Sequence, residues 1–192
     1  MITEPALHED VTRMKVTITF MRMDAPPSAP RLLLPAGWAL EHDVKPDVAA
    51  YRALHDGVGR SCCWWMRQAQ PDRVLASLLA TAPIGIGLLR ENGALRGFYE
   101  LDYADPQAVN LSYFGLFPQA IGRGVGRAFL DCVLRRAWRN QPRSVRVNTC
   151  TADHPRALPL YLGAGFTPLR QVDEVWDVPD RLGLDIPHRL RV

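Results

Sequence analysis

Glycines at alternate positions, Gly122, Gly124 and Gly126, form the pattern in this sequence that most directly suggests chemistry. Because glycine has no Cβ atom, a loop of this kind lets the backbone approach a ligand closely. From Arg127 onward the apolar residues recur at helical spacing, on a face made of Leu130, Val133, Leu134, Ala137 and Trp138. A helix that starts there points its free N–H groups and positive dipole end at the loop. The sequence therefore predicts a site for a phosphate or pyrophosphate, and Arg123 and Arg127 flank it.

Other interpretations of the glycine loop fit less well. A P-loop needs Lys followed by Ser or Thr after its last glycine, but Arg127 and Ala128 stand there, which excludes it. A dinucleotide-binding loop needs a third glycine at the position of Arg127 and normally opens a chain of βα units. A turn that merely reverses the chain is the further alternative. The elements on either side of the loop bear on this choice.

Two strands and a helix are expected around this loop. The apolar run Leu111–Phe117 ends at Pro118, which cannot continue a strand ladder. Beyond the helix, Ser144–Cys150 alternates apolar and polar residues, as a strand with two different faces does. In the following segment Pro155 suits the first position of a helix, with Asp153 or His154 as its cap and the region Gly163–Gly165 as its end.

Pro159 lies inside this second helix. It lacks the N–H group of an intrahelical bond and its ring clashes with the preceding turn. The helix is therefore expected to be distorted or to begin near Leu158, with Tyr161 in its first full turn.

This order of elements resembles the GNAT superfamily of acyl-CoA-dependent N-acyltransferases. The family signature is a strand, an Arg/Gln-x-x-Gly-x-Gly/Ala loop and a helix, then a strand and a helix that carries Tyr shortly before a Gly-Phe pair. This sequence has IGRGVG at 121–126, then Tyr161, then Gly165-Phe166. Two positions depart from the pattern: Ile121 replaces the usual Arg or Gln, unless Gln119 takes that role, and His154 stands where Asn is common.

The resemblance covers about Trp38 to Val178 and implies an α/β (α+β) fold, a mixed, largely antiparallel central sheet flanked by helices. Upstream, Ile84–Arg90 and Leu95–Tyr103 look like two of its strands, joined by an Asn-Gly hairpin turn at 92–93. Val48–Val58 and Trp64–Ala80 have helical spacing and would be the helices that border the acceptor in that family.

The resemblance further implies an N-acetyltransferase that uses acetyl-CoA as acyl-donor co-substrate and no metal. It would transfer the acetyl group directly, in a ternary complex, to a primary amine of a small molecule or peptide. Backbone N–H groups at Leu116 and Phe117 would receive the thioester carbonyl, and Tyr161 would protonate or position the departing sulfur. The expected cofactor-binding residues are Leu116, Phe117, Ile121, Gly122, Arg123, Gly124, Val125, Gly126, Arg127 and His154.

The general base is expected on a central strand. Glu100 is the first candidate, because a carboxylate on the otherwise apolar strand around GFYELDY needs a reason. An exposed position on an edge strand, or a structural hydrogen bond, is an equal alternative. His154 is the second candidate, since imidazole titrates near neutrality. Near the acceptor, Trp64 and Trp65 lie beside Met66 and Arg67, where they could stack on an aromatic or cationic amine or simply belong to the core.

Composition sets the remaining expectations for this chain of 192 residues. One domain over residues 31–192 is expected, after an N-terminal extension, residues 1–30, with a strand at Val16–Met23 and a Pro-rich linker at Asp24–Pro30. The absence of a leader or a long apolar run predicts a cytoplasmic protein without membrane contact. The four cysteines lack metal-ligand spacing and are expected as free thiols.

A net charge of only +3 argues against a dedicated nucleic-acid binder. An RNA-binding domain is the least favoured alternative, because no aromatic stacking motif accompanies the arginines. A catalytically silent acyl-CoA-binding or sensor module is the main alternative to the enzyme. A homodimer is compatible with both functions.

Overall fold

The computed structural model describes residues 9–192, and its strands form one sheet of seven in the order β2-β3-β4-β5-β6-β1-β7. Neighbouring strands are antiparallel, except that β5 and β6 are parallel. The strands are β1 (Val11–Met23), β2 (Trp38–Val44), β3 (Ile84–Glu91), β4 (Ala94–Asp105), β5 (Ala108–Leu116), β6 (Ser144–Cys150) and β7 (Thr167–Pro179). The α-helices are α1 (Val48–Gly59), α2 (Trp65–Ala69), α3 (Asp72–Thr81), α4 (Gly126–Ala137) and α5 (Ala157–Gly163).

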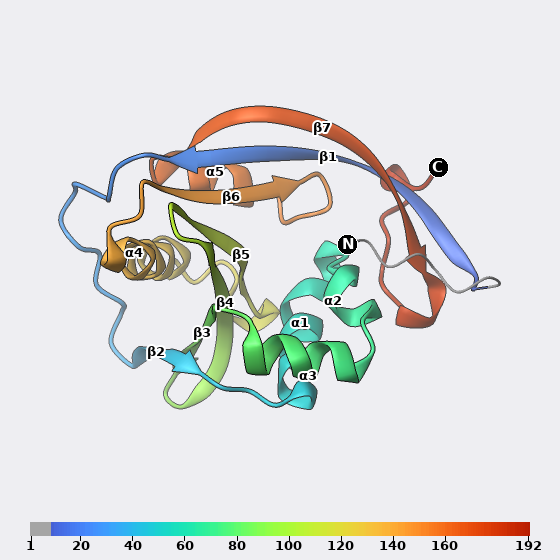
Figure 1. Ribbon diagram of the computed structural model, residues 1–192, viewed down its shortest axis with the longest axis horizontal. Helices are drawn as coiled ribbons and strands as arrows, with labels where there is room; N and C mark the ends of the chain where they lie inside the picture. The colour runs from blue at the N-terminus through green and yellow to red at the C-terminus, as the bar shows by residue number, and fades with distance from the viewer. Residues whose placement is uncertain (1–8) are drawn as a thin grey trace.

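Helices cover both faces of the central strands. Figure 1 shows α4 on one side of β4 and β5, and the group α1, α2 and α3 on the other. On β4, Tyr99 and Leu101 pack in the core around α4, whereas Phe98 packs in the core around α1. Because successive side chains on a strand point to opposite faces, Glu100 lies on the α1 side with Phe98. The mixed, largely antiparallel sheet flanked by helices is the fold class that the sequence predicts.

Strands β5 and β6 pair over a short stretch and then part. Ala108–Leu111 is paired with Ser144–Val147, but residues 112–116 and 148–150 are not paired with each other. The register of β5 on β4 shifts at the same place, because Glu100 faces Tyr113 while Leu101 faces Leu111. Ser112 is therefore an extra residue on β5, and such a bulge bends the strand that carries it.

The hairpin and the two helices nearest the glycine loop agree with the sequence. β3 and β4 are joined by Asn92 and Gly93, which have φ angles of 47° and 83°. This is the left-handed conformation that an Asn-Gly turn favours. Helix α1 closely matches its predicted range, and α4 begins at Gly126, one residue before the predicted start.

Two predicted helix boundaries are wrong. The single helix expected over Trp64–Ala80 is two helices, α2 and α3, because Pro71 disfavours a helical conformation for Gln70 before it. Pro155 is not the first residue of α5, which begins at Ala157. Pro159 is thus the third helical residue, where an N–H group has no intrahelical partner, so the proline costs no hydrogen bond.

The strand expected at Val16–Met23 starts earlier, at Val11, and lies inside the sheet between β6 and β7. Residues 11–23 therefore contribute an interior strand to the same sheet as the rest of the described chain. Figure 1 shows β1 and β7 running together as a long curved pair. Among the helices of residues 9–192, none has the length and apolar character needed to cross a membrane.

Candidate active site

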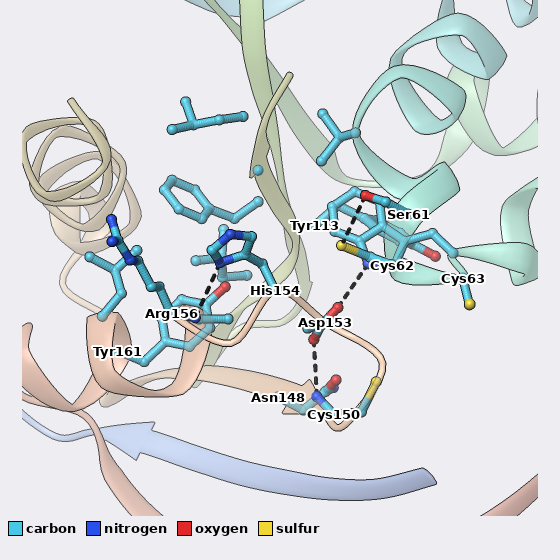
Figure 2. Close-up of a pocket in the computed structure, with 18 of the residues that line it drawn as sticks. Ser61, Cys62, Cys63, Tyr113, Asn148, Cys150, Asp153, His154, Arg156 and Tyr161 are labelled. Atoms are coloured by element: carbon cyan, nitrogen blue, oxygen red, sulfur yellow. Dashed lines mark hydrogen bonds between the residues drawn. The ribbon is translucent and has the colours of Figure 1, made fainter. Parts of the chain in front are cut away.

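A cavity of about 950 Å³ opens where β5 and β6 part. Its floor includes the separated parts of these strands, and its rim includes the glycine loop before α4 and the start of α5. On the opposite side it is bounded by the segment Ser61–Arg67, which follows α1 and includes the first residues of α2. Figure 2 shows Arg156 and Tyr161 on one side of this cavity, beside α4, and Cys62 and Cys63 on the other.

The glycine loop has the open backbone that a ligand cradle requires. Gly122 and Gly124 have φ angles of 82° and 77°, in the left-handed region that side-chain-bearing residues disfavour. A Cβ atom built on either residue would meet nothing within 4 Å, and both residues line the cavity. No side chain of the described residues caps α4 at Val125, so the N–H groups of its first turn stay available to a ligand.

Two guanidinium groups face this loop without an acidic partner in residues 9–192. Arg127, predicted from the sequence, and Arg156, which the sequence did not single out, both line the cavity and form no ion pair there. Arg156 could have been noticed as a base just before the helix that carries Tyr161. Together with the α4 N-terminus, they make this end of the cavity suitable for phosphate groups.

Arg123 is held elsewhere. Its Nη1 forms an ion pair of 2.5 Å with Glu91, and its guanidinium lies 5.4 Å from the centre of the Trp38 ring. Arg123 is the first cause of a lowered pKa of Glu91, and Arg96 adds to it. Neither Arg123 nor Val125, which is fully buried in the core, lines the cavity. Arg123 therefore ties the loop to the end of β3, whereas Val125 anchors it in the core.

Of the two backbone N–H groups expected to bind the thioester carbonyl, only that of Leu116 is available to a ligand. The Phe117 N–H donates to Arg96 O at 2.8 Å and is committed to β4. Since successive N–H groups along a strand point to opposite edges, the Leu116 N–H points away from β4, into the gap toward β6. Leu116 lines the cavity and Phe117 does not. Leu116 is thus the N–H donor that the fold leaves available at this point of the strand.

Tyr161 lies in the wall of the cavity, 6% exposed, with its ring near those of Phe114 and Phe166. Burial strongly raises the pKa of its hydroxyl, so the phenol stays neutral. Next to it, the His154 Nδ1 accepts a hydrogen bond of 3.2 Å from the backbone N–H of Arg156. His154 therefore stabilises the turn before α5 and lines the cavity at the same time.

Asp153 does not cap α5. Its Oδ1 accepts from Trp64 Nε1 at 3.1 Å, and its Oδ2 accepts from Thr149 Oγ1 and from the Cys150 N–H. These bonds join the end of β6 to the segment that precedes α2, across the cavity. The aspartate is consequently a fixed bridge between the two walls.

Glu100 is fully buried behind the cavity wall. Its Oε2 accepts from the Tyr51 hydroxyl at 2.5 Å, and its Oε1 accepts from Arg67 Nη2 at 3.0 Å. Arg67 lines the cavity, and Glu100 itself does not. The structure therefore shows a carboxylate that neutralises and orients Arg67, with both oxygens engaged.

The wall formed by β6, β1 and β7 was not identified from the sequence. In register, Ile18 faces both Cys150 and Val172, so the cavity-lining residues Ile18, Cys150, Glu174 and Trp176 share one face of the sheet. Trp176 packs against Trp65, with ring centres 6.4 Å apart. The alternation in VDEVWDV could have placed Glu174 and Trp176 on one face.

The cysteines are free thiols, as expected. Burial raises the pKa of Cys62, that of Cys63 to about 11 and that of Cys150 to about 12. Cys62 and Cys150 line the cavity, but a thiol with a raised pKa is a weak nucleophile near neutral pH.

Comparison with solved structures identifies the fold. The chain aligns with a GCN5-related N-acetyltransferase from Sphaerobacter thermophilus (20% identity, TM-score 0.57, 89% of this chain and 53% of that one). It also aligns with a tandem GNAT protein of the clavulanic acid biosynthesis pathway (16%, 0.61, 88% and 55%). A third match is an aminoglycoside acetyltransferase from an uncultured soil metagenomic sample (15%, 0.56, 71% and 92%).

The protein therefore has the fold of the GNAT acetyltransferases. It spans about half the length of the first two of these neighbours, 53% and 55%. No known protein-family model matches the sequence. No curated protein is similar enough in sequence to count as a relative.

Proposed function

We propose that the protein is an acyl-CoA-dependent N-acyltransferase that moves an acetyl group from acetyl-CoA to the primary amine of a small molecule or peptide. The observation that carries this proposal is one cavity that joins an open glycine loop to a strand edge with an available N–H group. Two arginines that have no acidic partner in residues 9–192 lie beside the loop. The GNAT fold supports it.

The residues at the loop fit an acyl-CoA. The space above Gly122 and Gly124 would take a pyrophosphate, with the N–H groups of the α4 first turn as donors. Arg127 and Arg156 would neutralise its charge. When bound, acetyl-CoA supplies a thioester carbonyl that an amine can attack.

In this proposal the backbone of β5 stabilises the reacting carbonyl. The Leu116 N–H donates to the oxygen on which negative charge develops. The amine attacks directly, because the thiols of the cavity have raised pKa values and are poor candidates for carrying the acyl group. As the C–N bond forms and the C–S bond breaks, the amine loses one proton and the departing sulfur gains one.

Tyr161 would interact with the departing sulfur. A phenol whose pKa is raised keeps its proton, so full transfer to a thiolate of lower pKa is uphill. Tyr161 is therefore proposed as a hydrogen-bond donor that positions the sulfur. Glu100 remains a candidate base only if it releases Arg67 or Tyr51, since both of its oxygens are engaged.

Calorimetric titration with acetyl-CoA tests the donor, with desulfo-CoA and NAD as comparators. Binding of the two CoA ligands and not of NAD is the expected result. Turnover is then measured as acceptor-dependent release of free thiol across an amine panel. Failure of both CoA ligands to bind would refute the proposal.

A catalytically silent acyl-CoA-binding module is the second candidate. The hydrogen bonds that occupy both oxygens of Glu100, and Ile121 in place of Arg or Gln in the loop, favour it. Saturable acetyl-CoA binding without thiol release for any amine of a broad panel would support this module over the enzyme.

A further inference from the structure

Glu174 is a carboxylate in the cavity wall that the proposed reaction does not use. Its Oε2 accepts a hydrogen bond of 2.7 Å from Trp176 Nε1, which fixes the carboxylate in place. Within residues 9–192, no Lys, Arg or His forms an ion pair with it. A half-buried carboxylate without a cation favours a positively charged ligand group beside it.

The surroundings of Glu174 are suited to an organic cation. Trp176 and Trp65 stand with ring centres 6.4 Å apart and an interplanar angle of 58°, and both line the cavity. Indole faces attract ammonium and guanidinium groups. Trp65 is 5% exposed and Trp176 is half-buried, so Trp176 offers more of the indole surface that a cation in the cavity can reach.

The charges of the cavity separate along its length. Arg127 lies in the first turn of α4, directly after the glycine loop, and Arg156 lies at the start of α5. Glu174 lies on β7, three strands from β5 in the sheet order. A second carboxylate of the cavity, Asp153, lies between β6 and α5 and accepts three hydrogen bonds. Arg67 adds no net charge between them, because Glu100 neutralises it. A molecule that spans the cavity thus meets positive charge at one end and negative charge at the other.

Glu174 is unsuited to contact the reacting amine. An amine attacks only in its neutral form, and a carboxylate beside it would stabilise the protonated form. The favourable partner of Glu174 is therefore a cationic group of the acceptor that does not react.

We infer that the acceptor is a small organic dication, whose second positive group binds Glu174 against Trp176 and Trp65 while its reacting amine lies toward Tyr161. This inference rests on the proposed transferase function and names its acceptor class. It makes Glu174 a specificity-determining residue.

The experiment compares unbranched α,ω-diamines with amino alcohols and ω-amino acids of matching length, at saturating acetyl-CoA. The diamines are expected to show a kcat/KM at least about tenfold above that of the alcohols, the factor given by one charged contact. Glu174→Gln keeps an acceptor for Trp176 Nε1 but removes the charge. It should raise KM for the diamine about tenfold, with kcat and the affinity for acetyl-CoA unchanged, and should leave the amino alcohol unaffected.

Asp173→Asn is the matched control. It removes the same charge from the neighbouring residue on the other face of β7, where Asp173 pairs with Lys15 at 3.0 Å. This variant should keep the preference for diamines. Equal effects of the two variants, or a preference for the ω-amino acids in the wild type, would overturn the inference.

Binding separates this inference from the transferase proposal. Diamine binding to the complex with desulfo-CoA is measured by calorimetry, in the wild type and in Glu174→Gln. Binding that depends on Glu174, without turnover, would support the acceptor class and refute the enzyme. Turnover of amines irrespective of Glu174 would support the enzyme and refute the acceptor class. Acetyl-CoA binding with neither binding nor turnover of diamines would also refute the acceptor class.

Discussion

Gly124→Ala separates the conformational role of the glycine loop from its role in binding. Gly124 has a φ angle of 77°, and a Cβ atom there would meet nothing within 4 Å. The substitution therefore adds no clash in the free protein. It should still lower the free energy of unfolding by ~1–2 kcal/mol, because a residue with a Cβ atom disfavours the left-handed conformation. For a chain of this size, that corresponds to a fall in Tm of about 2–8 °C.

Gly93→Ala is the matched control for that cost. Gly93 has a φ angle of 83° and equally open space around a Cβ atom, but it lies in the β3–β4 hairpin and not in the cavity wall. Both variants should lose a similar free energy of unfolding. Only Gly124→Ala should lower the affinity for acetyl-CoA, because the added methyl group enters the space that the phosphates would occupy. We expect at least a tenfold loss, about 1.4 kcal/mol.

The assay is thermal unfolding of both variants, with and without acetyl-CoA, together with calorimetric titration. In the wild type and Gly93→Ala, saturating acetyl-CoA should raise Tm by the same amount, since a ligand that binds the folded state alone stabilises it according to its affinity. In Gly124→Ala that increase should shrink. Equal acetyl-CoA affinities in the two variants would show that the loop does not cradle the ligand.

Three further predictions concern buried polar groups. Tyr161→Phe keeps the ring packing and should lower kcat about tenfold or more, with an unchanged KM for acetyl-CoA. The pH profile of kcat should fall at the same alkaline pH in the variant and the wild type, because the raised pKa of Tyr161 keeps the phenol neutral. Glu100→Gln should lower the free energy of unfolding by about 3–5 kcal/mol, because it leaves the Arg67 charge unpaired, and Arg67→Met in the double variant should restore part of the loss. A large fall in kcat without a change in Tm would instead identify Glu100 as the base. Burial lowers the pKa of His55 from 6.5 to about 3, so below about pH 6.5 the unfolded chain binds a proton that the folded chain does not. The free energy of unfolding is therefore unaffected by His55 above about pH 6.5 and falls progressively as the pH drops toward 3. Between pH 7 and pH 5, the free energy of unfolding should fall by about 2 kcal/mol more in the wild type than in His55→Leu. An equal fall in the two proteins would contradict a neutral buried imidazole.

Local patterns in the sequence were sufficient to predict the helices and strands around the glycine loop. The glycines, the apolar spacing of α4 and the Asn-Gly turn each depend on neighbouring residues, and the structure has the elements they predict. The position of the Arg123 side chain depends on its ion pair with Glu91, which is distant in the sequence and contacts Arg123 only in the folded chain. The environment of Glu100 likewise requires α1 to bring Tyr51 and α2 to bring Arg67 to its carboxylate.

The cavity itself could not be predicted, because it depends on one extra residue in β5. Val109 and Leu111 face the core around α4, and beyond Ser112 so do Phe114 and Leu116. The change from odd to even positions means that strict alternation over Leu111–Phe117 would assign Phe114 and Leu116 to the wrong face.

The same bulge links the core to the proposed chemistry. By shifting the register on β4, it lets β5 bend away from β6 while Phe114 and Leu116 remain packed around α4. Within the described residues, the bend leaves the Leu116 N–H without a strand partner. An unpaired backbone donor is tolerated best where a ligand or solvent can reach it. A variant without Ser112 would restore alternation, pair the strands further and close the cavity between them. The extra residue in β5 is therefore as much a part of the proposed site as the glycine loop.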